Sequence, residues 1–122
     1  MSSSLRKGMR YETAARQYLE RQGLTLLDTN FRCRGGEIDL VMRDQDTTCF
    51  IEVRYRKHGA YGGAAESITP RKRQRIIHAA LTYLASQPRL MQQALRFDAL
   101  LIDQAASGDV GFNWIRSAFD AE

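Results

Sequence analysis

Two short apolar runs that contain acidic residues dominate the first half of the sequence. The first spans residues 37–42 and contains Asp39, and the second spans residues 49–55 and contains Glu52. Both runs are rich in β-branched and aromatic residues, with two glycines before the first and an Asp-Gln-Asp turn between them. This pattern predicts two strands of one hairpin.

The positions of the acids within these strands predict that they meet. Side chains alternate between faces along a strand, so Glu37 shares a face with Asp39, and Arg54 shares a face with Glu52. If the two faces coincide, the carboxylates of Asp39 and Glu52 converge. Buried carboxylates need a cation or hydrogen-bond donors, so the pair predicts a site for Mg²⁺ or Mn²⁺. The alternative is that both acids lie on a solvated face of the sheet.

The same spacing suggests a chemistry. Two acids on adjacent strands can hold metal ions that polarise a phosphodiester, activate a water molecule and stabilise the leaving oxygen. Arg54, two residues after Glu52, would lie beside them and could stabilise the charge that develops on the phosphate. An Asp followed about a dozen residues later by Glu-x-Lys or Glu-x-Arg occurs by chance in many chains. The pattern alone is therefore weak evidence for a metal site.

Basic residues are unevenly distributed. Residues 1–90 carry sixteen Lys and Arg against nine Asp and Glu, whereas residues 91–122 carry two against five, and the formal net charge is +4. Fifteen of the eighteen basic residues are Arg, whose planar guanidinium suits bidentate phosphate contacts. The distribution predicts a polyanionic partner, with nucleic acid first. A basic face that only keeps the protein soluble is the alternative.

Length and composition predict one cytoplasmic domain. A chain of 122 residues can build one core, so we expect a single domain over residues 1–122, with flexible ends at 1–7 and 117–122. No apolar run approaches the roughly 18 residues of a membrane helix, and the first residues lack the apolar core of a signal peptide. The two cysteines, Cys33 and Cys49, suggest neither a disulfide framework nor a zinc site.

A first helix is predicted over residues 8–22, ending at Gly23. Its apolar residues fall at the i, i+3, i+4, i+7 spacing of one helix face; they are Tyr11, Ala14, Ala15, Tyr18 and Leu19. Glu12 lies at the edge of this face. A strand is predicted over 24–31, before the two strands of the hairpin.

A second helix is predicted from Thr69, as N-cap, and Pro70 to about Gln87, where Pro88 ends it. We expect its buried face to consist of Ile76, Ile77, Ala80, Leu81 and Leu84. Strands are predicted over 96–102 and 112–115, with Trp114 in the core. The resulting order, α-β-β-β-α-β-β, is typical of one mixed sheet flanked by helices, an α/β fold.

The region around the start of the second helix is rich in basic and polar residues. Positive side chains in a first helical turn oppose the helix dipole, so local stability does not explain them, whereas a phosphate ligand would. Exposed helix-forming residues are the alternative. The predicted nucleic-acid contacts, which include residues of the glycine-rich loop at 56–68, are Arg56, Lys57, Tyr61, Arg71, Lys72, Arg73, Gln74 and Arg75. We interpret His58 and His78 as structural or incidental.

Several motifs in order resemble one known family. They are residues 8–12, 30–32, 36–40 and 50–56, then Lys72, Tyr83 and Leu84, and finally residues 96–98. Together they resemble the bacterial YraN family of predicted endonuclease-like proteins, across nearly the whole chain. That family is similar to the archaeal Holliday-junction resolvases and the restriction-endonuclease-like superfamily. The resemblance implies a restriction-endonuclease-like mixed sheet, a Mg²⁺-dependent endonuclease (hydrolase) activity and a homodimer as one arrangement.

The resemblance also implies roles for individual residues. Asp39 and Glu52 match the signature acids and are implied metal ligands, and Glu12 matches an acid of the first helix that supplements the metal site. Arg54 stands where the signature has Lys. Because Arg stays charged, it can orient and stabilise but cannot hand over a proton.

Three hypotheses follow. The first is a metal-dependent endonuclease acting on DNA, with branched or structured DNA favoured by the resolvase likeness. The second is a non-catalytic nucleic-acid-binding module on the same fold. The third is an interaction subunit of a DNA-processing assembly. The oligomeric state and the preference between DNA and RNA stay open.

Overall fold

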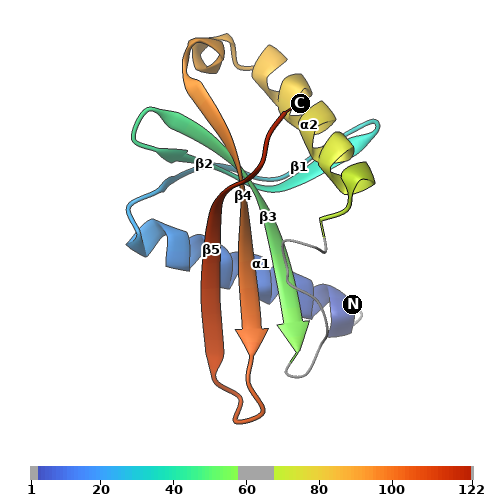
Figure 1. The fold of residues 1–122 in the computed structure, drawn as a ribbon, viewed down its shortest axis with the longest axis vertical. Helices are drawn as coiled ribbons and strands as arrows, with labels where there is room; N and C mark the ends of the chain where they lie inside the picture. The colour runs from blue at the N-terminus through green and yellow to red at the C-terminus, as the bar shows by residue number, and fades with distance from the viewer. Residues whose placement is uncertain (1–2, 58–67, 122) are drawn as a thin grey trace.

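The structure, a computed structural model, describes the backbone of residues 3–57 and 68–121, and the side chains of 11–56 and 68–121. A five-stranded sheet carries two α-helices (Figure 1). The elements are α1 (Ser3–Arg21), β1 (Thr25–Cys33), β2 (Gly36–Asp44), β3 (Thr47–Lys57), α2 (Pro70–Ala85), the 3₁₀ helix η1 (Pro88–Gln92), β4 (Ala94–Gln104) and β5 (Val110–Phe119). The predicted α/β class and element order are confirmed.

The five strands lie side by side in sequence order, with β3 and β4 parallel and all other pairs antiparallel. The parallel pair requires a crossover, which contains α2. Pairing of β2 with β3 runs from Asp44 opposite Thr47 to Leu40 opposite Ile51, whereas β4 pairs with β3 along its whole length. Figure 1 shows β1 and β2 turning across the molecule while β3, β4 and β5 continue together. The two parts of the sheet therefore separate just beyond Leu40 and Ile51.

Two apolar clusters hold the helices on the sheet. The cluster around α1 contains Ala15, Leu19, Leu24, Leu40, Met42, Cys49, Ile51, Leu100 and Ile102. The cluster around α2 includes Ile76, Ile77, Ala80, Tyr83, Leu84, Val41, Phe50, Phe97, Ala99 and Leu101. Because β3 alternates regularly, the residues of β3 that follow Phe50 at every second position, Glu52 and Arg54, lie on the α2 side.

The start of α2 is as predicted. The Thr69 hydroxyl accepts a hydrogen bond from the Lys72 backbone N–H at 3.2 Å, and Pro70 occupies the first turn. The predicted buried face is wrong at one position, since Leu81 is 61% exposed and Tyr83 is buried instead. The helix ends at Ala85, two residues before the predicted end. Its buried face follows the spacing 76, 80, 83, 84, which leaves position 81 outside the contact with the sheet.

Regular secondary structure extends toward both ends of the chain. Residues 3–7 lie in α1 and residues 117–119 lie in β5, and the expected flexibility of these ends stays a prediction. No Gly or Pro interrupts residues 3–7, so the helix continues through them. At the other end, the backbone N–H of Ser117 donates to the buried Asp98 at 3.0 Å, which ties the end of β5 to β4. Within the described residues, no helix is long and apolar enough to cross a membrane.

Candidate metal and nucleic-acid site

Asp39 and Glu52 meet where β2 separates from β3. The Asp39 Oδ2 accepts a hydrogen bond from the Val53 backbone N–H at 2.9 Å, and the Asp39 and Glu52 side chains are hydrogen-bonded to each other. The sequence prediction that these carboxylates converge is confirmed. Two ionised carboxylates are both acceptors, so the bond between them requires a proton on one of the two.

Both acids bind protons more tightly than usual. Burial raises the pKa of Glu52 to about 8, helped by the negative charge of Asp39 and opposed by Arg54 and Lys72. Burial also raises the pKa of Asp39 to about 6; the Val53 N–H opposes this rise, and the charges of Glu12 and Glu37 add to it. The nearby positive charge therefore does not offset the cost of burying the two carboxylates, because a fully compensating charge would lower both pKa values.

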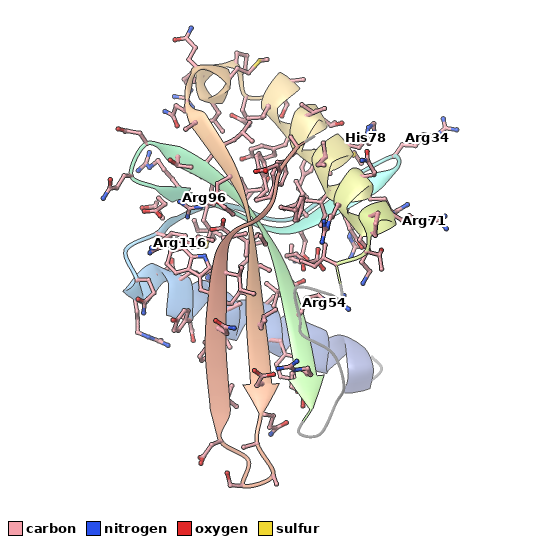
Figure 2. The ribbon with its side chains drawn as sticks, in the orientation of Figure 1. Arg34, Arg54, Arg71, His78, Arg96 and Arg116 are labelled. Carbon is pink, nitrogen blue, oxygen red and sulfur yellow. The ribbon has the colours of Figure 1, made fainter. Side chains whose placement is uncertain are left out.

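Two cationic side chains lie on the Glu52 side of the pair. Arg54 places its Nη1 atom 3.9 Å from the Glu52 Oε1, and the Glu52 side chain is 16% exposed. Lys72, in the first turn of α2, is near enough for its charge to act on Glu52. Figure 2 shows Arg54 on the α2 side of β3, below the start of that helix. A phosphate group reaching Glu52 would meet positive charge from two elements.

The donor chemistry of Asp39 and Glu52 fits a hard divalent cation. Mg²⁺ in phosphate-processing sites is usually held by one or two carboxylates together with water and substrate phosphate oxygens. Such a cation would replace the shared proton and supply the positive charge that the raised pKa values indicate. Among the residues that the structure describes, no three His, Cys, Asp or Glu side chains are grouped closely enough to hold a metal. Asp39 and Glu52 are thus the protein ligands that the geometry offers.

The other two acids that the sequence suggested lie beside the pair. Glu12 lines a pocket between α1, β1 and β2, and its contribution is the negative charge that acts on Asp39. Among the described residues, Glu12, Asp39 and Glu52 do not form a three-carboxylate group. The Glu37 side chain is 58% exposed and lies 3.6 Å from the Arg32 guanidinium.

The predicted nucleic-acid contacts divide into four groups. Arg71, Gln74 and Arg75 are exposed on α2. Arg56 and Arg73 are turned onto the protein: the Arg56 Nε lies 2.8 Å from the Asp103 carboxylate, and the Arg73 Nε donates to the Ile68 carbonyl at 3.0 Å. Tyr61 and the side chain of Lys57 lie outside the described residues, as does His58, whereas Lys72 is half-buried beside Glu52, as described above.

Two features escaped the sequence reasoning. The fully buried Asp98 accepts hydrogen bonds from Arg96, the Trp114 indole N–H at 2.9 Å and the Ser117 backbone. The other is a contact between His78 and the turn at Arg34, with His78 Nε2 at 2.9 Å from the Arg34 carbonyl oxygen. The tandem glycines after Arg34 were the available signal, since paired glycines often permit a close backbone approach.

Comparisons with known proteins reveal one family. A model described as "Uncharacterised protein family UPF0102" matches residues 11–102. The chain is 47% identical over 119 residues to a UPF0102 protein of Pseudomonas fluorescens, covering 98% of this chain and 97% of that protein. It is 47% identical to UPF0102 proteins of Ectopseudomonas mendocina over 121 residues and of Pseudomonas aeruginosa over 120 residues. Coverage is 99% of this chain and 100% of the relative in the first case, and 98% and 96% in the second.

Proposed function

The chain belongs to the uncharacterised protein family UPF0102, which is YraN-like as the sequence motifs predicted, and for it we propose a metal-dependent endonuclease activity on DNA. The reaction is hydrolysis of a phosphodiester, with structured or branched DNA as the favoured substrate. One observation carries the proposal: Asp39 and Glu52 lie together, both with raised pKa values, beside Arg54 and Lys72, which supports a divalent-cation site next to a phosphate site.

Each residue of the site has a distinct role in this proposal. Asp39 and Glu52 hold Mg²⁺ or Mn²⁺ through their carboxylate oxygens, and the Val53 N–H fixes the orientation of Asp39. Arg54 and Lys72 bind the phosphate oxygens and stabilise the negative charge that grows on them during hydrolysis. The bound ion supplies Lewis acidity and lowers the pKa of a water molecule.

Glu12 has a subsidiary role. Its charge acts on Asp39, and its pocket lies on the α1 side of the same sheet. We propose that Glu12 strengthens the negative potential that attracts the ion without binding it directly. Replacing Glu12 by Gln should therefore weaken metal affinity less than replacing either member of the pair.

The second candidate is a nucleic-acid-binding module that does not cut. Arg54 favours it, because a guanidinium keeps its proton at all physiological pH values and cannot act as an acid for the leaving oxygen. In this case the same cations bind phosphate, while Asp39 and Glu52 bind an ion that contributes to binding alone.

A cleavage assay separates the two candidates. The wild-type protein is incubated with labelled single-stranded, duplex, flap and four-way-junction DNA, and with RNA of the same sequences, in Mg²⁺, in Mn²⁺ or in EDTA. The variants are Asp39→Asn and Glu52→Gln, and the matched control is Asp46→Asn, an exposed acid in the turn between β2 and β3.

The endonuclease proposal expects cleavage that requires the metal, is lost in Asp39→Asn and Glu52→Gln, and persists in Asp46→Asn. Loss of each metal ligand should reduce the rate by at least about a hundredfold, because the whole electrostatic stabilisation by the ion is removed. Salt-sensitive binding without cleavage in either metal would reject the enzyme and support the binding module. Cleavage that survives in EDTA or in both variants would reject the proposed site.

A further inference from the structure

The turn between β1 and β2 is fixed to α2 by close contacts. Arg34 and Gly35 form the tip of this turn, and the His78 imidazole of α2 is hydrogen-bonded to the Arg34 carbonyl oxygen at 2.9 Å. A Cβ atom at Gly35 would approach the His78 ring at 3.3 Å. At Gly36 it would overlap the Arg75 carbonyl oxygen and lie 3.2 Å from the Ala79 side chain. The glycines thus allow the turn to rest directly on the helix backbone.

This packing places the exposed side chain of Arg34 beside a basic face of α2. Arg71, Arg75 and His78 follow one another at i, i+4 and i+7, so they share one helix face, and Arg71 and Arg75 are exposed. Figure 2 shows Arg34, Arg71 and His78 at the same side of the molecule, with Arg54 further along that side. The surface formed by Arg34, Arg71 and Arg75 is here called the arginine surface.

Ion pairs among the described side chains do not explain the arginine surface. The α2 sequence from Pro70 to Ala85 contains no Asp or Glu. Within the side chains that the structure describes, 11–56 and 68–121, no acid forms an ion pair with Arg34, Arg71 or Arg75. Their like charges repel one another, and the positive end of the helix dipole is unfavourable for Arg71. A ligand with several regularly spaced negative charges offsets both costs.

The arginine surface and the candidate site each draw a residue from the first turn of α2. Lys72 is adjacent to Arg71 in α2, and its charge acts on Glu52. The distance along α2 from Arg71 to Arg75 is about 6 Å at roughly 1.5 Å per residue. Successive phosphates of one DNA strand advance about 3.4 Å along the helix axis, so a strand following α2 can present one or two phosphates over this distance.

We propose that Arg34, Arg71 and Arg75 bind the phosphate backbone of the DNA segment next to the scissile phosphate, and that His78 is a positioning residue that fixes the Arg34 turn. This inference rests on the proposed DNA substrate and extends it by stating where one arm of the substrate lies. The arm leaves the Asp39 and Glu52 pair along α2 and ends at the β1–β2 turn. Contacts of this kind recognise phosphate and not base sequence.

Equilibrium binding in EDTA tests the inference without any cleavage. Fluorescence anisotropy with labelled duplex and four-way-junction DNA gives the slope of log K against log salt between roughly 50 and 200 mM. Each lost phosphate contact reduces the slope by about 0.9. We expect this change in Arg34→Ala, Arg71→Ala and Arg75→Ala, with affinity about three- to tenfold weaker near 150 mM salt. Arg43→Ala, an exposed arginine at the far end of β2, is the control and should match the wild type.

His78 is tested through its dependence on Arg34. His78→Ala should weaken DNA binding in the wild-type background but have no further effect in Arg34→Ala. His78→Gln should restore binding, because the Gln amide N–H can donate to the same carbonyl oxygen. Equal effects of His78→Ala in both backgrounds would refute the positioning role, and thermal unfolding of each variant shows whether the fold is intact.

The outcomes distinguish this inference from the proposed function. If the wild type cleaves DNA but the salt slopes of all three arginine variants are unchanged, the arginine surface does not bind phosphate. The endonuclease proposal is unaffected by that result. Reduced slopes without cleavage in any metal would support the surface and reject the enzyme. A wild type that binds neither DNA at low salt overturns both.

Discussion

Replacing Glu52 by Gln should make the metal-free protein more stable at alkaline pH, although it removes the central acid of the candidate site. The pKa of Glu52 is raised from 4.5 to about 8, chiefly by burial and then by the charge of Asp39. Gln has nearly the same shape, and its amide N–H can donate to Asp39 in place of the shared proton. The substitution therefore keeps the contact and removes the cost of ionising a buried group.

The magnitude and its sign follow from proton linkage. A raised pKa means that the folded protein keeps a proton on Glu52 that the unfolded chain has released. The contribution of Glu52 to the free energy of unfolding is therefore fully present below about pH 4.5 and is lost as pH rises toward 8. Each pKa unit corresponds to about 1.4 kcal/mol, so the full shift sets a ceiling of roughly 5 kcal/mol. Because Asp39 and Glu52 ionise as a pair, we expect Glu52→Gln to recover about 2 to 4 kcal/mol above pH 8.

Urea unfolding in EDTA, from about pH 5 to about pH 9, measures this difference. The gap in unfolding free energy between Glu52→Gln and the wild type should widen with pH and level off above pH 8. Asp46→Asn, at an exposed position in the turn between β2 and β3, should run parallel to the wild type. A gap that is constant across the pH range would refute the reasoning, because it would show that Glu52 ionises equally easily in the folded and unfolded chain.

Three further predictions concern metal binding, Arg54 and the buried network. Mg²⁺ or Mn²⁺ should stabilise the wild type by about 1 to 3 kcal/mol at ten to a hundred times its Kd and should not stabilise Asp39→Asn, as thermal unfolding with and without metal would show; equal stabilisation of both would contradict the site. Arg54→Lys should raise the rate of DNA cleavage about tenfold or more, because Lys can exchange a proton, and an unchanged or lower rate in single-turnover assays would count against that role. Asp98→Ala should lower the free energy of unfolding by about 3 to 5 kcal/mol, because it leaves the Arg96 guanidinium without its buried partner; urea unfolding beside the exposed-site control Asp120→Ala would show whether the cost is specific.

Much of the fold could be predicted because local rules and burial agree in this chain. Thr69 and Pro70 marked the start of α2 through capping chemistry, and the spacing of Tyr11 to Leu19 marked the buried face of α1. The apolar runs around Asp39 and Glu52 fixed two strands and their alternation. Leu81 was misplaced because both possible faces of α2 contain apolar residues, and contact with the sheet decides between them.

The sequence by itself determined which two carboxylates could form the candidate site, since strand alternation allows Asp39 and Glu52 to converge if their faces coincide. Only the tertiary structure decided how these groups are arranged. It showed that β2 leaves β3 just beyond Leu40, that Glu12 lies in a neighbouring pocket, and that α2 brings Lys72 to Glu52. It also joined Arg34 to His78, 44 residues apart. Alternation along a strand is a local property of the backbone, whereas contacts between distant elements depend on how the whole core packs.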